Sequence, residues 1–406
     1  MSVIIANTRT IRQLDDVPTS FKLAALALLR ARRGSLEVTL PDQRVVLFDH
    51  GVNGPHAKLT FLDYAVAKRA MAGGDVGFAE SYMDGEWETP DLTTVLRFFS
   101  ANFEAAGQLA VGGALVRAMN LLRHMFNRNS KSGARRNITA HYDLGNEFYA
   151  SWLDPSMTYS SARFDNPNQS LEQGQQSKYA GICDGISAGP GSNILEIGCG
   201  WGGFAEYAAK ERGSKVTCLT ISPSQREYAQ KRMFEQGLND QVEIRLEDYR
   251  DHTGSYDGVA SIEMFEAVGE RYWPSYFAKV AEVLKDGGRA ALQIITIDDK
   301  LFPRYRKRAD FIQRYIFPGG MLPSEAALKD QVAAAGLRYD GASLFGQDYA
   351  RTCAEWRRSF NDKWDRLEGL GFDFAFKQMW NFYLSYCEAG FLDGRINVGQ
   401  FQLAKA

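Results

Sequence analysis

One loop of the sequence combines a carboxylate with closely spaced glycines. Residues 193–204 read NILEIGCGWGGF, so Glu196 lies in an apolar run that leads into Gly198, Gly200, Gly202 and Gly203. Glycines let a backbone turn sharply and approach a ligand closely. The apolar run predicts a buried strand, and the helical spacing after the loop predicts a helix. The loop is therefore expected to be the first strand-to-helix turn of a doubly wound α/β sheet, where ligands bind beyond the strand ends.

Two ligand classes compete for such a loop, and a plain tight turn is the alternative to both. A dinucleotide-binding loop has the spacing G-x-G-x-x-G and rests a pyrophosphate on the helix N-terminus. Here the spacing is E-x-G-x-G-x-G-G. The Glu196 carboxylate would repel pyrophosphate but would attract an ammonium group. S-adenosylmethionine (SAM) carries an ammonium and a sulfonium and no phosphate, so the acid favours SAM.

The next predicted strand, residues 215–219, supports the same choice. A dinucleotide fold normally ends this strand in Asp or Glu, which binds the ribose hydroxyls. In this sequence Thr220 follows the strand instead, and Gln225 lies in the first turn of a helix that begins at about Pro223. Ser222 and Pro223 are explained as the helix cap and the first helical residue. Thr220 and Gln225 are not explained in that way, and both can bind hydroxyls without a carboxylate.

Composition excludes several classes of protein. The chain has 406 residues, with 47 basic and 49 acidic residues, so no nucleic-acid partner is expected. Five cysteines form no C-x-x-C pair and the histidines are scattered, so no metal site is expected and a reducing compartment fits. There is no secretory signal, and no apolar run approaches the ~20 residues of a membrane-spanning helix. We expect a soluble, cytoplasmic protein that contacts lipid only from the surface.

The chain is expected to divide into two domains. Residues 1–106 predict a smaller, lipid-associated α+β domain, which includes a β-hairpin around the Pro-Asp turn at residues 41–42. Residues 107–134, rich in Gly, Ala and Arg, are interpreted as a connector. Residues 135–406 form the second domain, in which strands and helices alternate from Asn193 onward, so a mostly parallel sheet covered by helices is predicted.

Four further stretches indicate a family: ITAHYDLGNEFYASWLDPSMTYSSARF, SIEMFEAVGERYW, FIQRYIFPGGMLPS and FGQDYARTCAEW. Together with the glycine loop and TISPSQ, they resemble the cyclopropane fatty acyl phospholipid synthases and the related mycolic acid methyltransferases. The resemblance covers residues 135 to 395, and ESYMDGEWE extends it into the N-terminal domain. It implies a Rossmann-like class I SAM methyltransferase domain.

The resemblance also implies a reaction. An alkene in an unsaturated phospholipid acyl chain attacks the methyl group of SAM, and the resulting carbocation loses a proton from the new methyl as a cyclopropane ring closes. The family uses a bound bicarbonate as the proton acceptor. A carbocation needs an apolar, water-free pocket, and aromatic faces can stabilise it. Two or three of the following aromatic residues are expected to line the acyl channel: Phe148, Tyr159, Phe164, Phe265, Tyr315 and Phe317.

The family's SAM contacts can be carried over onto matching positions. They are Tyr159, Ser160, Glu196, Gly198, Cys199, Gly200, Trp201, Gly202, Thr220, Gln225, Asp248 and Tyr249 beside the adenine, and Ile262.

The residues expected around bicarbonate are Glu266, Tyr349, Gln293 and Ser161, and the last two depart from the family pattern. Ser161 stands where the family usually has cysteine, whose contribution is largely through the backbone. Gln293 stands near the family's histidine, and glutamine can donate a hydrogen bond but cannot carry a proton. These departures place the proton-accepting step in question, although not methyl transfer.

The ring-forming synthase is the first hypothesis. The alternative is methylation of the same alkene without ring closure, which gives a methyl-branched chain, and a distant alternative is a non-catalytic module that binds lipid or SAM. Residues 298–311 interleave cations with Phe302, Tyr305 and Phe311. This segment is interpreted either as a contact with lipid phosphates at the inner face of the membrane or as a solvated charged face. The sequence leaves open whether the chain forms a homodimer.

Overall fold

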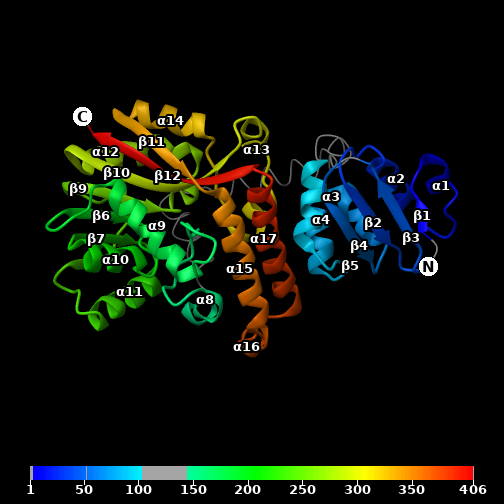
Figure 1. Ribbon diagram of the computed structural model, residues 1–406, viewed down its shortest axis with the longest axis horizontal. Helices are drawn as coiled ribbons and strands as arrows, with labels where there is room; N and C mark the ends of the chain where they lie inside the picture. Colours follow the sequence, from blue (N-terminus) through cyan, green and yellow to red (C-terminus); the bar gives the residue numbers. More distant parts are fainter. Residues whose placement is uncertain (1–2, 52, 103–143, 406) are drawn as a thin grey trace. The chain divides into compact units, whose positions relative to one another are not determined.

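The computed structural model in Figure 1 describes residues 3–51, 53–102 and 144–405. These residues form two compact units. The first contains residues 3–102, 308–311 and 364–393, and the second contains residues 144–307, 312–363 and 394–405. The predicted connector, 107–134, lies outside the described residues.

The first unit is built on a five-stranded sheet of order β1-β3-β2-β4-β5. Its strands are β1 (Val3–Ile5), β2 (Ser35–Thr39), β3 (Val45–Asp49), β4 (His56–Phe61) and β5 (Trp87–Glu88), and its helices are α1 (Thr8–Arg12), α2 (Thr19–Leu28), α3 (Ala65–Met83) and α4 (Leu92–Ala101). The predicted hairpin is confirmed, because β2 and β3 pair antiparallel with Ser35 opposite Asp49. Leu36 and Val38 alternate with more exposed residues along β2, as a half-buried strand requires.

Two helices from the far end of the chain complete this unit. They are α16 (Trp364–Gly369) and α17 (Phe374–Leu392). The Thr93 hydroxyl of α4 donates to Glu388 at 2.8 Å, and the Arg97 Nε donates to Asp393 at 2.8 Å. The first unit is therefore not a contiguous N-terminal segment.

The second unit contains a seven-stranded sheet of order β11-β12-β10-β9-β6-β7-β8. Its strands are β6 (Asn193–Ile197), β7 (Lys215–Thr220), β8 (Val242–Leu246), β9 (Tyr256–Ile262), β10 (Leu284–Ile297), β11 (Leu337–Leu344) and β12 (Ile396–Lys405). Strands β6 to β10 pair parallel, and β12 pairs antiparallel with both β10 and β11. The predicted mostly parallel sheet is confirmed.

Helices cover this sheet, as Figure 1 shows. The helices of this unit are α8 (Asn146–Trp152), α9 (Leu171–Gly185), α10 (Gly203–Arg212), α11 (Pro223–Glu235), α12 (Trp273–Val283), α13 (Phe302–Tyr305), α14 (Glu325–Ala334) and α15 (Gly346–Asp362), with short helices η1 (Phe265–Ala267), η2 (Glu270–Tyr272) and η3 (Ile312–Ile316). Alternate residues of β6 enter two separate cores: Ile194 packs with α9 to α11, and Leu195 and Ile197 pack with α12 and α14. Burial on both faces explains why this strand reads as a continuous apolar run.

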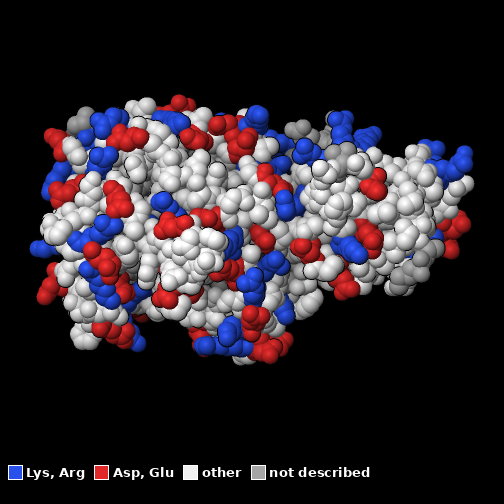
Figure 2. Space-filling model, viewed as in Figure 1, with Lys and Arg blue, Asp and Glu red and all other residues white. Residues whose placement is uncertain are grey.

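In residues 298–311, the segment predicted to contact lipid, the phenylalanine side chains are not available at the surface as that prediction requires. Phe302 and Phe311 are buried, and Phe302 stacks on Trp273 with ring centroids 6.2 Å apart. Arg306 forms an ion pair with Glu270. The phenylalanines therefore cannot dip into a membrane interface while the core is intact. No helix in the described part of the chain is long and apolar enough to span a bilayer. Over the second unit, the face in Figure 2 shows basic and acidic side chains intermingled.

Candidate active site

The predicted site residues converge at one edge of the second sheet. Strands β6, β7, β8 and β9 are parallel, so the loops that follow them begin at the same carboxyl edge. Strand β6 lies between β7 and β9, which is the position where the strand order reverses. Ligands of open α/β sheets bind at this switch point.

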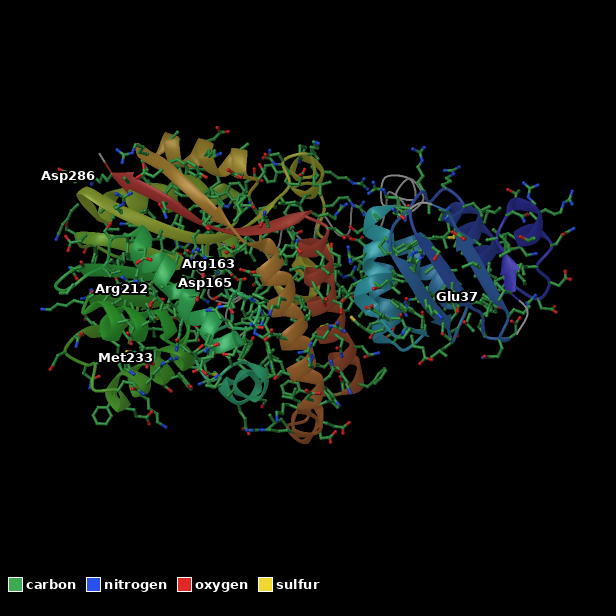
Figure 3. The ribbon with its side chains drawn as sticks, viewed as in Figure 1. Glu37, Arg163, Asp165, Arg212, Met233 and Asp286 are labelled. Carbon is green, nitrogen blue, oxygen red and sulfur yellow. The ribbon has the colours of Figure 1, made fainter. Side chains whose placement is uncertain are left out.

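The glycine loop leaves open space where a ligand would approach. Gly198, Gly200 and Gly202 have φ of 85°, 53° and 84°, in the left-handed region that favours glycine. A Cβ at Gly200 would meet no atom of the described residues within 4 Å, whereas one at Gly202 would lie 3.2 Å from the Cβ of Ala229 and 3.1 Å from Met233, which Figure 3 labels on α11. Gly202 thus serves helix packing, and Gly200 faces the open space.

Other contacts hold this loop in place. The amide nitrogens of Gly198 and Cys199 both donate to the Leu219 carbonyl of β7 at 3.0 Å. The Trp201 indole donates to Asn146 Oδ1 of α8 at 2.8 Å. The loop therefore has fixed partners on both sides.

Glu196 is buried within β6, with 2% of its surface exposed. The Cys218 thiol donates to its carboxylate at 3.4 Å. Burial raises the pKa of Glu196 to about 7, and the thiol, Lys178 and Arg232 act in the opposite direction. A cationic ligand nearby would favour the ionised form, so this acid suits the ammonium group expected from the sequence.

The remaining residues carried over for SAM follow the neighbouring strands. The Thr220 hydroxyl, at the end of β7, donates to Gln225 Oε1 at 3.1 Å, and both residues are buried. After β8, Arg250 binds the Asp248 carboxylate through Nε at 2.8 Å and Nη2 at 2.6 Å. Tyr249 packs against Tyr276, and burial raises the pKa of Tyr249 to about 12. Ile262 ends β9 and pairs with Gln293.

An aromatic cluster lies beside these residues. The ring of Tyr159 contacts Tyr149, Trp152 and Trp356, with centroids 5.3 to 5.7 Å apart. Phe148 joins the cluster through Tyr149 at 5.0 Å. Phe265, another predicted channel residue, instead packs in the core against Trp273, Tyr276 and Phe277. The cluster is apolar and rich in aromatic faces, and such faces can stabilise a cation.

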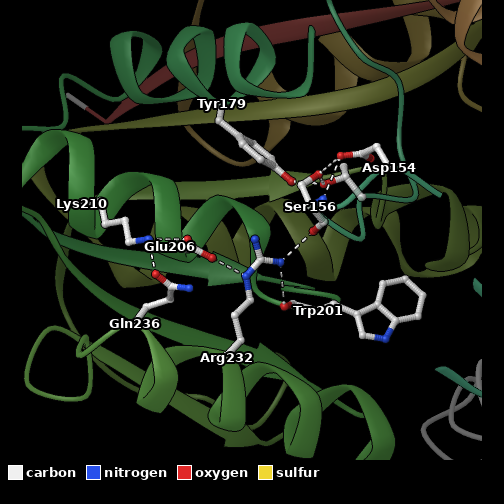
Figure 4. A network of polar contacts seen from close by, with 9 residues as sticks. Asp154, Ser156, Tyr179, Trp201, Glu206, Lys210, Arg232 and Gln236 are labelled. Atoms are coloured by element: carbon white, nitrogen blue, oxygen red, sulfur yellow. Dashed lines mark hydrogen bonds and ion pairs between the residues drawn. The ribbon is translucent and has the colours of Figure 1, made fainter. Parts of the chain in front are cut away.

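Arg232 of α11 ties the segment before Tyr159 to the glycine loop (Figure 4). Its Nη1 donates to the Ser156 carbonyl at 2.7 Å and to the Trp201 carbonyl at 3.5 Å, and its Nε bonds Glu206. Ser156 in turn donates to Asp154. One guanidinium thus holds two loops that are far apart in the sequence.

Glu263, which immediately follows β9, lies at the centre of the polar cluster. The Ser161 amide donates to its Oε1 at 2.8 Å, and the Gln293 Nε2 donates to the same oxygen at 2.8 Å. The Tyr349 hydroxyl donates to Oε2 at 2.6 Å. Burial raises the pKa of Glu263, and the Tyr349 hydroxyl, Lys178, Gln293 and the Ser161 amide lower it. The three donors expected around bicarbonate therefore bind a carboxylate of the protein itself.

Two details of this arrangement bear on the departures from the family pattern. The Ser161 hydroxyl donates to the Ala162 carbonyl at 2.8 Å, so Ser161 serves Glu263 through its backbone amide alone. Gln293 is oriented by Gln400, whose Nε2 donates to Gln293 Oε1 at 3.2 Å, so the Gln293 Nε2 faces Glu263. Both substitutions leave a donor in place.

Glu266, the acid expected to bind bicarbonate, is separate from these donors. The Ile295 amide donates to its Oε1 at 2.6 Å, and its Oε2 is buried with no hydrogen-bond partner among the residues that the structure describes. Burial, and then the charge of Glu263, raise the pKa of Glu266 to about 8. Burial and the neighbouring charge thus favour the protonated form of Glu266, whereas Glu263 has the donors that favour a carboxylate.

Glu263, Lys178 and Arg232 were missed by the sequence reasoning. The signal for Glu263 was available, because it follows the same strand end as Ile262 in SIEMFE. The match to the family acid points to Glu266 instead. Nothing local distinguishes Lys178 or Arg232 from other helical cations.

A match to a protein-family model identifies the relatives of this chain. Residues 129–401 match the model described as mycolic acid cyclopropane synthetase. The chain belongs to this family. It is 38% identical to the tuberculostearic acid methyltransferase UfaA1 of Mycobacterium tuberculosis, over 96% of this chain and 93% of that one. It is 35% identical to the cyclopropane-fatty-acyl-phospholipid synthase of Escherichia coli K12, over 80% of this chain and 81% of that one.

Solved structures agree with this assignment. The cyclopropane synthase MmaA2 of Mycobacterium tuberculosis matches with a TM-score of 0.63 and 28% identity, covering 67% of this chain and 98% of that chain. The mycolic acid cyclopropane synthase CmaA1, complexed with SAH and CTAB, matches with a TM-score of 0.63 and 27% identity over the same shares. The predicted class I SAM methyltransferase fold and the predicted family are confirmed, and the family is one of SAM-dependent enzymes that modify lipids.

Proposed function

We propose that this protein methylates a double bond in an unsaturated phospholipid acyl chain, with Glu263 as the proton acceptor, and yields a methyl-branched unsaturated chain. The observation that carries the proposal is the Glu263 carboxylate held by the Ser161 amide, the Gln293 amide group and the Tyr349 hydroxyl. A base fixed in this way is available for the proton that the acyl carbocation must lose.

SAM supplies the methyl group in this proposal, and the residues present fit it. Open space in front of Gly200 leaves room for a ligand against the loop backbone. Glu196 is a buried acid whose ionisation a cationic ligand would favour. Thr220 and Gln225 place polar groups at the end of the next strand, where ribose hydroxyls would be bound.

Methylation and proton loss balance without any other reactant. The π electrons of the acyl double bond form a bond to the methyl carbon, and the methyl–sulfur bond breaks with its electron pair remaining on sulfur. The positive charge is then on the acyl chain, beside the aromatic cluster around Tyr159. Loss of a proton to the Glu263 carboxylate restores a double bond, so the chain gains CH₂ in total. The aromatic rings serve by excluding water that would trap the cation.

Bicarbonate does not fit this site. Its expected donors already bind Glu263, and a second anion beside that carboxylate would be repelled. We therefore derive no step through bicarbonate. An acceptor that differs from that of the ring-forming enzymes favours a different fate for the cation. The near full-length similarity to a tuberculostearic acid methyltransferase supports this preference.

Ring closure is the second candidate, because the family model and the relative from Escherichia coli are both named for cyclopropane formation. Both candidates add the same mass to the lipid, so mass spectrometry reports turnover and proton NMR must separate the products. We expect retained vinyl signals with a new branch, in buffer depleted of bicarbonate. Upfield cyclopropane protons, formed only when bicarbonate is supplied, would overturn the proposal.

A further inference from the structure

Helix α9 presents a row of polar side chains to the segment that carries Tyr159 and Ser160. Lys178 is completely buried, and its ammonium donates to the Ser160 hydroxyl at 2.6 Å, its only hydrogen bond to the described residues. Gln175 Nε2 donates to the Ser160 carbonyl at 3.1 Å, and Tyr179 shares a hydrogen bond with Thr158 at 2.6 Å. The segment is thus fixed from one side by a single helix.

A buried ammonium with one hydrogen-bond partner is costly unless charges nearby compensate it. Burial lowers the pKa of Lys178 to about 7, and the carboxylates of Glu263, Asp154 and Glu196 act to raise it. Among these acids, Glu263 has the largest effect on the pKa of Lys178. The two groups also bind adjacent residues, because Lys178 binds the Ser160 hydroxyl and Glu263 accepts from the Ser161 amide.

We propose that the Lys178 ammonium is the counter-charge that keeps the Glu263 carboxylate ionised and that it also fixes Ser160 beside that carboxylate. Lys178 is a positioning residue in this account, since it acts on the reaction through Glu263 and Ser160. The inference rests on the proposed function of Glu263 as proton acceptor.

The other charged and titratable groups around Lys178 and Glu263 decide how the pKa of Glu263 responds when Lys178 is removed. Glu263 faces Glu266 of η1, whose own ionisation it disfavours, and the Tyr349 hydroxyl of α15. The charges of Asp154 and Glu196 also act to raise the pKa of Lys178, in addition to that of Glu263. Removing the ammonium leaves Glu263 with no compensating cation among these groups, so its protonated form should persist to higher pH.

The first experiment is the pH dependence of methyl transfer in Lys178→Met and Lys178→Gln. We expect the acidic limb to move to higher pH by about one unit, so that the rate one unit below the wild-type midpoint falls about tenfold. Ser160→Ala is the matched control, because it removes the hydrogen bond and keeps the ammonium. It should weaken SAM binding and leave the midpoint in place. A uniform loss of rate with an unmoved midpoint in both Lys178 variants would overturn the proposal.

A second experiment keeps the lysine, because removal of a buried ammonium can prevent folding. The pKa of Lys178 is followed by NMR of ¹³Cε-labelled lysine, with the signal assigned by its absence in Lys178→Arg. In Glu263→Gln the ammonium loses a negative neighbour, so its pKa should fall by about half a unit or more. An unchanged value would show that the two groups do not interact. This readout does not depend on activity, so it remains decisive if Glu263 is not the proton acceptor.

Discussion

Replacing Glu263 by glycine would empty the centre of the site while keeping its donors. Glu263 has φ of 49°, in the left-handed region where a non-glycine residue costs on the order of 1 kcal/mol or more, so glycine relieves strain here. The change removes the acceptor of the Ser161 amide, the Gln293 Nε2 and the Tyr349 hydroxyl. An anion bound in the emptied space could accept all three hydrogen bonds, each worth about 1 kcal/mol. The total of about 3 kcal/mol would raise its affinity roughly a hundredfold over an anion that makes none of these bonds.

We expect Glu263→Gly to lose methyl transfer by about 10² to 10⁴, the range for removal of a general base. Added bicarbonate should restore part of the activity. The restored rate should saturate near ~10 mM bicarbonate, because a dissociation constant of that size is roughly a hundredfold below the 1 M standard state. The assay is mass spectrometry of methylated lipid in buffer depleted of bicarbonate, to which bicarbonate is then titrated. Wild-type enzyme should not respond to the titration.

The matched control is Glu263→Gln, which removes the charge and keeps the side chain among the donors. It should be as inactive as the glycine variant and should not respond to bicarbonate, because the amide still fills the space. Full activity of Glu263→Gly without bicarbonate would refute the role of Glu263 as proton acceptor. Dependence of the wild-type enzyme on bicarbonate would refute the replacement of that anion by Glu263.

Three further predictions concern the loop, the second acid and the arginine clamp. Gly200→Val should abolish SAM binding in calorimetric titration, whereas Gly237→Val, with a similar φ and open surroundings, should not. The pKa of Glu266 is about 8 in the folded protein and 4.5 for the ordinary group, so folding favours its protonated form. The free energy of unfolding should therefore fall as the pH rises from 4.5 to about 8. Glu266→Gln should gain stability over the wild type there, by at most ~1.4 kcal/mol per pH unit in thermal melts, and parallel curves would contradict this. Arg232→Met should weaken SAM binding about tenfold or more, because the charge-assisted hydrogen bonds of Arg232 are lost. Lys231→Met, at an exposed neighbouring cation, is the control. Equal SAM affinities of the two variants would show that Arg232 does not shape the site.

The sequence by itself determined the parts of this protein that follow from local periodicity and turn chemistry. The apolar run into the glycine loop gave β6 and α10 in their observed order. The cap and proline at Ser222 and Pro223 gave the start of α11, where the Ser222 hydroxyl accepts from the Gln225 amide. These features depend on residues within a few positions of one another, so a single chain segment contains all the information that they require.

The tertiary structure decided which acid is at the centre of the site. Glu263 binds residues 102 positions before it and 86 positions after it in the chain, and nothing in the local sequence records those contacts. Motif matching therefore predicts Glu266 instead, although burial favours its protonated form and its Oε2 has no hydrogen-bond partner among the described residues. A hydrogen bond is satisfied by whichever acceptor the packed elements bring within about 3 Å, and only the assembled sheet edge brings Glu263 to all three donors.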